Sequence, residues 1–431
     1  MEVVEAGLAA LLRVICEPVR REGFTVKYFL RTFGCRVNQA ETEELRALLI
    51  SAGHTPAKVP AEAELCVVNT CTVTRDADRE ALKLLRRVTR ENPAAQLVVT
   101  GCLAARAPES VRAAAPSATI VKGGKEGLAQ ALGLPGLESP TLAPDRARAL
   151  LKIQDGCDGS CSYCVVPQVR PELHSLPPEI VLDKARALVV QGVAEIVLCG
   201  IRLGRYRHGA VGFSGLLERL LLLPGNFRLR LSSLEMTEAD DHLAALIADS
   251  GGKICPHLHL PLQSGSDATL RRMNRPYRAA QFARCAEALC RRVPDLALFT
   301  DIITGFPSES EAEFRESLEF VRSLGLCGLH VFRFSPRPGT PAATMPGAVA
   351  PTLARERLES WQALDRELRL GHQKRAAGRR RVVAPLRNGV RGLTEDFLEV
   401  RLERPLPPGL WEVNLRDASN TAIICDSRLN G

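Results

Sequence analysis

The residues of this chain best suited to chemistry are three cysteines within eight positions. Cys157, Cys161 and Cys164 are separated by three residues and then by two, in the stretch 153–167. Thiolate sulfur is a soft ligand that selects iron–sulfur clusters or zinc. Gly156 and Gly159 give the loop the backbone freedom to direct three sulfurs to one centre. The spacing therefore predicts a metal site in this loop.

Two kinds of metal site fit these three thiols. Structural zinc takes four protein ligands, and His174 is the only nearby residue that offers a fourth. An iron–sulfur cubane normally takes four cysteines, so a set of three leaves one iron open to a substrate or cofactor. The absence of a fourth cysteine at short range favours the cluster.

A second set of cysteines follows three predicted strands. Apolar runs at 26–33, 65–69, 96–100 and 118–121 alternate with amphipathic helical stretches, which predicts a parallel sheet with helices packed on it. Cys35, Cys71 and Cys102 each stand at the carboxyl end of a run, the edge at which such sheets bind ligands. We expect these thiols to converge on a second cluster, or on a zinc ion completed by a further ligand.

The motifs around both sets resemble one enzyme family. The spacing of Cys157, Cys161 and Cys164 resembles the cluster loop of the radical S-adenosylmethionine (SAM) enzymes. The segments 34–43, 69–73 and 99–102, which read GCRVNQAETE, NTCTV and VTGC, look like the amino-terminal domain of the radical methylthiotransferases. They are most similar to the branch that acts on N6-threonylcarbamoyladenosine in tRNA. The resemblance implies two [4Fe-4S] clusters held by all six cysteines, SAM as cofactor, and a catalytic role for the cluster of Cys157, Cys161 and Cys164.

The central region predicts an open barrel. Six strand–helix units fill residues 149–370, too few to close an eight-stranded barrel, and the site should lie at the carboxyl ends of the strands. The resemblance implies that residues at these ends contact SAM: Gly200, Gln263, Ser264, Gly305 and Glu309. Three histidines on or beside these strands, His257, His259 and His330, are expected to be core residues with satisfied hydrogen bonds.

One departure from the family pattern follows the cluster loop. The family usually shows Arg-Gly and then Ser-Arg, whereas this chain retains Arg170 and Ser175 but has Pro171 and Leu176 at the other two positions. If the missing arginine contacts the carboxylate of SAM in the family, cofactor binding should be weaker here.

The remaining segments complete the expected architecture. We expect an extension over 1–24, a cluster domain over 25–134, a linker over 135–148, a radical SAM partial barrel over 149–370 and a small carboxyl-terminal β-barrel over 371–431. The last domain resembles the RNA-binding TRAM domain by position. It begins in a basic stretch, residues 372–381, which suits a phosphate backbone, although a solvated helix end would also explain the charge.

Composition limits the classes of protein. The chain has 431 residues, 45% of them hydrophobic, with a formal net charge of +8. This excludes a disordered chain, and no apolar run is long enough to cross a membrane. Fourteen cysteines in a long chain without a secretory signal suggest reduced thiols in the cytoplasm.

Together these features predict an α/β enzyme that adds a methylthio group to N6-threonylcarbamoyladenosine in tRNA. The alternatives are the same reaction on isopentenyladenosine in tRNA, the same reaction on an aspartate of a ribosomal protein, or an RNA-binding protein with structural clusters. The enzyme would need tRNA as partner, a flavodoxin- or ferredoxin-like electron donor and a sulfur source that the sequence does not identify.

Overall fold

The computed structural model describes residues 25–122, 124–132, 134, 147–387, 389–416 and 421–428. The predicted extension and nearly all of the predicted linker lie outside these residues. The chain divides into two compact units. The first contains residues up to Leu142 together with the short segment Gln168–Pro171, and the second contains the rest.

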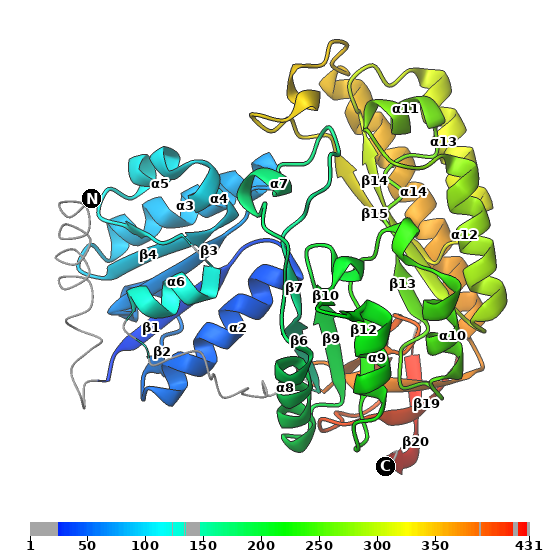
Figure 1. Cartoon of the computed structure of the whole chain (residues 1–431), viewed down its shortest axis with the longest axis horizontal. Coiled ribbons are helices and arrows are strands. Elements are labelled where there is room, and N and C mark those ends of the chain that lie inside the picture. Colours follow the sequence, from blue (N-terminus) through cyan, green and yellow to red (C-terminus); the bar gives the residue numbers. More distant parts are fainter. Residues whose placement is uncertain are drawn as a thin grey trace. The chain divides into compact units, whose positions relative to one another are not determined.

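The first unit is built on a five-stranded parallel sheet in the order β2-β1-β3-β4-β5 (Figure 1). Its strands are β1 (Lys27–Thr32), β2 (Thr55–Pro56), β3 (Leu65–Thr70), β4 (Gln96–Gly101) and β5 (Thr119–Ile120). All six residues of β3 are buried, because helices cover both faces of the sheet. The predicted parallel sheet is confirmed, and β2 is a short edge strand that the apolar pattern does not reveal.

Helices pack on both faces of this sheet. On one face, α2 (Arg36–Ser51) and α6 (Gly124–Ala131) contribute Leu45, Leu49 and Leu128 to a core with Val67 and Val98. On the other, α3 (Arg75–Glu91), α4 (Cys102–Arg106) and α5 (Pro108–Ala114) pack on alternate strand residues, among them Cys66, Val68 and Val99.

The second unit contains the predicted partial barrel, as two three-stranded parallel sheets. Their orders are β12-β9-β6 and β13-β14-β15, and a bridge between Leu229 and Ile254 connects them. The strands are β6 (Arg148–Lys152), β9 (Glu195–Cys199), β12 (Arg228–Leu231), β13 (His257–His259), β14 (Ala297–Thr304) and β15 (Gly328–Arg333). The six expected strands are therefore present.

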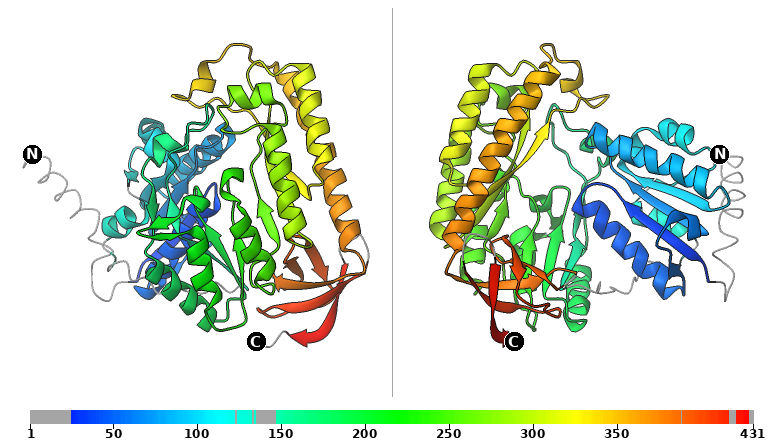
Figure 2. Two further views of the ribbon diagram at one scale, coloured as in Figure 1. Left: turned by 45° about the vertical axis from the view of Figure 1, so that its right-hand side comes forward. Right: turned by 180° about the vertical axis from the view of Figure 1, so that it is seen from behind.

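Helices cover the outer face of these sheets, and α13 and α14 lie side by side (Figure 2). The major helices are α8 (Pro178–Val190), α9 (Phe213–Leu221), α10 (Asp241–Asp249), α11 (Asp267–Arg272), α12 (Ala279–Arg292), α13 (Glu311–Ser323) and α14 (Pro351–Ala376). A continuous apolar core fills the space between helices and strands. Among the described helices, none combines the length and apolar character that a membrane crossing requires.

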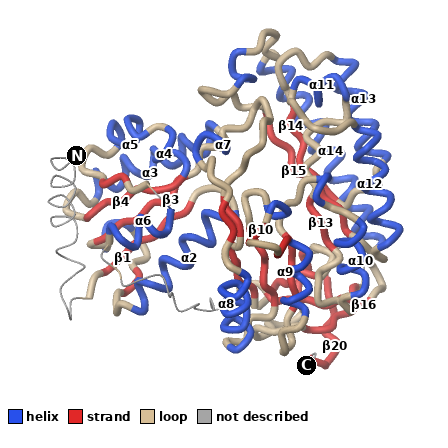
Figure 3. The backbone as a smooth tube through the Cα atoms, in the orientation of Figure 1, coloured by secondary structure: helices blue, strands red, loops and turns tan. Residues whose placement is uncertain are grey.

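The carboxyl-terminal strands form a small closed barrel, in the order β16-β17-β18-β20-β19. They are β16 (Arg380–Pro385), β17 (Arg391–Thr394), β18 (Glu399–Leu402), β19 (Trp411–Leu415) and β20 (Thr421–Arg428) (Figure 3). Only the β18–β20 pairing is parallel; the other pairings are antiparallel.

The basic stretch before this barrel does not form a single exposed patch. Its first part belongs to α14, which continues to Ala376, and some of its side chains are buried. His372 is buried, and its Nε2 lies 3.1 Å from the Asp396 carbonyl oxygen. Arg381 is also buried and donates to Asp396. The exposed cations of the stretch are Lys374, Arg375, Arg379 and Arg380.

Two candidate three-cysteine sites

The structure brings the first cysteine set together in the first unit. Cys35 precedes α2, Cys71 follows β3, and Cys102 begins α4. Burial raises the pKa of the Cys71 thiol to about 11, and the nearby Cys102 and Cys35 sulfurs add to this increase. Because a metal binds the thiolate, metal binding at this set must release the Cys71 proton.

Two glycines allow the backbone to approach this site closely. Gly34 has φ +97°, and a Cβ added there would lie 2.5 Å from Cys71 Cβ and 2.7 Å from its Sγ. Gly101 has φ +91°, and an added Cβ would lie 2.3 Å from the Thr70 carbonyl oxygen. Any other residue at either position would displace the segments that carry the thiols.

A buried polar network supports the first set. The Asn38 amide donates to the carbonyl oxygens of Phe33 and Thr70, at 3.0 Å each. Arg170 donates to Asn38 Oδ1 at 3.0 Å and to both carboxylate oxygens of Glu41, at 2.9 and 3.1 Å. Burial raises the pKa of the Cys102 thiol, and the Arg170 guanidinium opposes that effect. The network thus places one cation beside thiols that become anionic when they bind metal.

The second set lies in the loop after β7 (Gln154–Asp155). Burial raises the pKa of Cys164 to about 12, and the neighbouring Cys161 and Cys157 sulfurs contribute to the increase. Gly156 has φ +78°, and an added Cβ would lie 1.8 Å from the Glu172 carbonyl oxygen. The Gly159 N–H donates to Cys157 Sγ at 3.3 Å. The loop therefore folds back on itself as its spacing predicts.

Residues 272–275 hold the second cysteine loop in place. The Ser162 N–H donates to the Met273 carbonyl oxygen at 3.0 Å, and Asn274 Nδ2 donates to the Ser160 carbonyl oxygen at 2.7 Å. Arg275 is buried, pairs with Glu235 and donates to Cys161 Sγ at 3.3 Å. Sequence reasoning missed this segment, because nothing in its spacing relates it to a loop more than a hundred residues earlier.

The five residues expected to contact SAM all follow strands β9, β13 and β14, and three of them have defined roles within the fold. The Ser264 hydroxyl is buried 3.4 Å from Ser317 Oγ. Glu309 accepts from the Gly305 N–H and from Arg357, at 2.9 Å each.

Gln263 and Gly200 complete this group. Gln263 has φ +74°, and its backbone bonds to Asp301 and Ile303. No described residue bonds to its side-chain amide. Gly200 lies beside Gln154, whose Oε1 would be 2.9 Å from an added Cβ. The assignment of all five residues to SAM stays a prediction.

The residues at which this chain departs from the family pattern, and the neighbours it retains, have defined places in the fold. Leu176 packs against the apolar core of the second unit, and Ser175 Oγ accepts from the Arg207 N–H at 3.0 Å. Arg170 and Pro171 belong to the first unit. His174 is exposed in β8 (His174–Ser175), which pairs with β7.

The spacing of the three thiols in each set bears on the choice between a cluster and a zinc ion. Tetrahedral zinc with sulfur ligands at about 2.3 Å requires sulfurs about 3.8 Å apart. Among the described residues, only His259, Asp301 and His330 bring three potential ligand atoms within 4.8 Å of one another. In the described part of the chain, neither cysteine set has its three sulfurs within that distance of one another.

Comparison with known proteins places both cysteine sets in recognised domains. Residues 27–123 match the family model described as uncharacterized protein family UPF0004. Residues 151–321 match the model of the radical SAM superfamily. The two sets thus fall in different family domains of one chain.

Curated relatives resemble most of the chain. It is 33% identical over 371 residues to the threonylcarbamoyladenosine tRNA methylthiotransferase MtaB of Thermotoga maritima, covering 82% of this chain and 85% of the relative. Identity to MtaB of Bacillus subtilis is 37%, over 78% of this chain and 80% of the relative. A tRNA-2-methylthio-N(6)-dimethylallyladenosine synthase from Parafrankia sp. is 36% identical to this chain, over 82% of this chain and 76% of the relative.

Solved structures share the fold. The radical SAM methyltransferase TsrM from Kitasatospora setae has a TM-score of 0.54 at 16% identity, over 74% of this chain and 77% of its own. At these identities the likeness concerns architecture alone. The two family domains, the two cysteine sets and the relatives together assign the activity class. The chain belongs to the radical SAM methylthiotransferase family, whose enzymes use SAM and [4Fe-4S] clusters.

Proposed function

We propose that this enzyme converts N6-threonylcarbamoyladenosine in tRNA to its 2-methylthio derivative. The observation that carries the proposal is the presence of two separate three-thiol sites in one chain. A structural cluster would be closed by a fourth cysteine, whereas a set of three leaves a position for a reactant. The similarity to the two MtaB proteins supports threonylcarbamoyladenosine as the substrate.

The two cysteine sets would hold two [4Fe-4S] clusters. Cys157, Cys161 and Cys164 would hold one cluster, which would supply the electron for the cleavage of SAM. Cys35, Cys71 and Cys102 would hold the other, which would supply a site for the sulfur to be transferred. The carbon to be thiolated carries an unactivated C–H bond, which acid–base catalysis by side chains does not break.

The protein's own residues position and shield these sites. Arg275 fixes Cys161 through its N–H donor, and Arg170 places a cation beside Cys102. The backbone around the two cysteine sets packs closely because glycine stands at three positions, Gly34, Gly101 and Gly156. Of the residues expected to contact SAM, Gln263 has the side chain whose amide remains available to a ligand.

The proposed substrate also determines the partners and the compartment. tRNA is the macromolecular partner, and the reaction needs a low-potential electron donor of the flavodoxin or ferredoxin type together with a sulfur source. A tRNA substrate and reduced cysteines favour the cytoplasm.

Anaerobic turnover with defined RNAs tests the proposal. Reconstituted enzyme is supplied with SAM, a reductant and anticodon stem-loops that carry either threonylcarbamoyladenosine or dimethylallyladenosine, and the nucleosides are measured by mass spectrometry. We expect the 2-methylthio product from the first RNA. Cys157→Ala should abolish the reaction, while Cys290→Ala, at an exposed cysteine outside both sets, should retain it.

The second candidate substrate is dimethylallyladenosine, because the Parafrankia relative named for it is 36% identical to this chain. A 2-methylthio product from that RNA alone would replace the proposed substrate with this one. No product from either RNA, with an active control enzyme in parallel, would contradict both assignments.

A further inference from the structure

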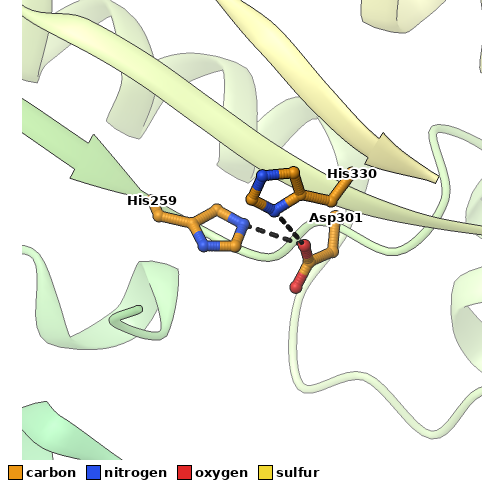
Figure 4. A group of neighbouring side chains, drawn as sticks. All are labelled: His259, Asp301 and His330. Carbon is orange, nitrogen blue, oxygen red and sulfur yellow. Dashed lines mark ion pairs between the residues drawn. The ribbon is translucent and has the colours of Figure 1, made fainter. Parts of the chain in front are cut away.

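Three polar side chains that the clusters do not use meet on the second unit's β13-β14-β15 sheet (Figure 4). His259 Nε2 lies 2.9 Å from Asp301 Oδ1, and His330 Nδ1 lies 3.3 Å from the same oxygen. The two imidazole rings are edge-to-face, with centroids 4.9 Å apart. Ser233 Oγ lies 2.9 Å from His259 Nδ1 and orients that ring. His330 is therefore not the core histidine that the sequence suggests, whereas His259 is largely buried, as expected.

The trio lies on the sheet face opposite the helices. Successive strand residues alternate between faces, and Leu258, Leu298 and Leu329 belong to the core beneath the helices. Their neighbours His259 and His330 therefore lie on the other face, and so does Asp301, which is paired with His330 in register. Toward the amino ends of the strands this face is covered, since Phe397 stacks on His257 and contacts Phe299.

A short chain of contacts connects the trio to the second cysteine set. The Leu234 N–H donates to the His259 carbonyl oxygen at 3.0 Å, and the next residue, Glu235, pairs with Arg275. Arg275 also donates to the Pro261 carbonyl oxygen at 3.1 Å and to Cys161 Sγ at 3.3 Å. The segments that carry the trio are thus the segments that hold the cluster loop.

The trio has unused hydrogen-bonding capacity on an accessible surface. The His330 side chain is 43% exposed, that of Asp301 19% and that of His259 12%. Within the described part of the chain, no hydrogen bond is made to Asp301 Oδ2 or His330 Nε2, and the buried Asp301 Oδ1 and His259 Nε2 also lack a hydrogen-bond partner of good geometry. The two histidines hold the pKa of Asp301 at about 2 against the effect of burial, so this carboxylate is an acceptor at neutral pH.

An exposed aromatic ring lies on the same face. Phe332 is two residues beyond His330 on β15, so both side chains leave the strand on one side, and Phe332 is 44% exposed. A nucleobase freed from its stack is commonly held on such a ring. An aromatic platform beside a polar group suits a base that carries a hydrogen-bonding substituent.

We propose that His330 and Asp301, oriented by His259, recognise the polar N6 substituent of the substrate adenosine, while Phe332 stacks on the base. The inference rests on the proposed function and adds the residues that set its specificity. One donor of the threonylcarbamoyl group, an amide N–H or the hydroxyl, would bond to Asp301 Oδ2, and His330 Nε2 would bond to the same substituent. A dimethylallyl group offers no such partner, so its binding would remove water from the trio without compensation.

A divalent metal is the other ligand that two histidines and a carboxylate can take. At 2.9 and 3.3 Å, the distances from the two histidine nitrogens to one carboxylate oxygen are compatible with hydrogen bonding and with metal ligation alike. The test therefore includes metal analysis.

The experiment compares kcat/KM for the two anticodon stem-loops that differ only at the N6 substituent, using cluster-loaded enzyme. We expect wild type to prefer the threonylcarbamoyl RNA. His330→Ala should reduce this preference about 10- to 100-fold, through a higher KM for that RNA, because sites built on hydrogen bonds discriminate by this route. His330→Gln should restore much of the preference.

Two further variants separate recognition from general damage. Phe332→Ala should weaken the binding of both RNAs to a similar extent, because stacking on the base does not depend on the N6 substituent. His242→Ala, at an exposed histidine that pairs with Glu218 on the surface, should match wild type.

The contrary outcomes are distinct. Two outcomes would overturn the inference and leave the proposed function standing. One is an unchanged preference for the threonylcarbamoyl RNA in His330→Ala. The other is a stoichiometric divalent metal, in addition to the cluster iron, that wild type holds and His330→Ala loses. A wild-type enzyme that modifies only the dimethylallyl RNA would overturn the proposed function itself.

Discussion

At the scale of single residues, an arginine held by a carboxylate lies beside each cysteine set. Arg170 lies beside Cys102 in the first unit, and Arg275 bonds to Cys161 in the second. Both side chains are held by a carboxylate, Glu41 for Arg170 and Glu235 for Arg275. Since three thiolates on one metal centre concentrate negative charge, a fixed cation nearby stabilises the bound state.

The first cysteine set should be separable from the second by one substitution. Cys71→Ala removes a ligand whose segment forms part of the first unit alone, so reconstituted protein should lose about four of about eight irons. It should still cleave SAM to 5′-deoxyadenosine but yield no methylthio product. Iron analysis and quantification of both products check this, with Cys66→Ala, a buried cysteine outside both sets, as the matched control. Normal methylthio product from Cys71→Ala would contradict the assignment of the sulfur site.

At the scale of elements, a buried ionic network joins the partial barrel to the small β-barrel within the second unit. Glu195 on β9 is fully buried and pairs with Arg228 and Arg230 on β12 and with Arg148 on β6. Arg228 also donates to the carbonyl oxygens of Val382 and Leu393, and Arg230 to those of Thr394 and Glu395. The guanidinium groups thus satisfy backbone acceptors of the small barrel.

Removing the charge of Glu195 should destabilise both parts of this unit. Glu195→Gln leaves three arginines without their counter-charge, and breaking a buried pair in this way costs about 3–5 kcal/mol. Denaturant unfolding at pH 7 measures the loss. Glu218→Gln, at an exposed carboxylate paired with His242, should stay within about 0.5 kcal/mol of wild type.

The effect of Glu195→Gln should depend on pH in a defined direction. Burial opposes ionisation of Glu195, but Arg230, Arg148 and Arg228 outweigh it and hold its pKa well below 4.5. A carboxyl group whose pKa is lowered in the folded state stabilises the fold at pH values above its ordinary pKa. This contribution is lost as the pH falls through the folded-state pKa. The difference in unfolding free energy between wild type and Glu195→Gln should therefore be at its full size at pH 7 and should shrink only at acidic pH. A difference that grew on acidification would contradict this account.

At the scale of the whole molecule, the small barrel has a structural role, and its role in RNA binding is a prediction. Its strands β16 and β17 and the turn after them supply the carbonyl acceptors for Arg228 and Arg230, and Phe397 covers one end of the inner sheet face. Deleting the barrel would therefore disturb the catalytic unit as well as any RNA contact. Surface substitutions are the cleaner test of RNA binding.

Exposed arginines of the small barrel should contribute to tRNA affinity. Arg380 on β16 and Arg401 on β18 are exposed, and removing one cation that binds a phosphate should lower the slope of log affinity against log salt by about 1. The double variant Arg380→Ala and Arg401→Ala should bind tRNA more weakly, with a slope lower by about 2 and unchanged thermal stability. Arg322→Ala, at an exposed arginine of α13, is the control. Equal slopes in the double variant and wild type would remove these residues from the RNA surface.

Much of the molecule follows from the sequence alone, because local patterns report local structure. Alternating apolar runs and amphipathic stretches predict the parallel sheet and the six-stranded partial barrel, and close cysteine spacing predicts the metal loop. Since parallel strands end at one edge, even the meeting of Cys35, Cys71 and Cys102 can be predicted without coordinates.

Only the tertiary structure decided which distant side chains meet. Arg170 joins Glu41, and Arg275 joins Cys161, each across more than a hundred residues of intervening chain. His330 joins His259 and Asp301 from three different strands. No spacing rule relates such positions, because strand register and loop path determine these contacts. For the same reason, His330 resembles a core residue in the sequence, whereas its strand register places it on an accessible polar face.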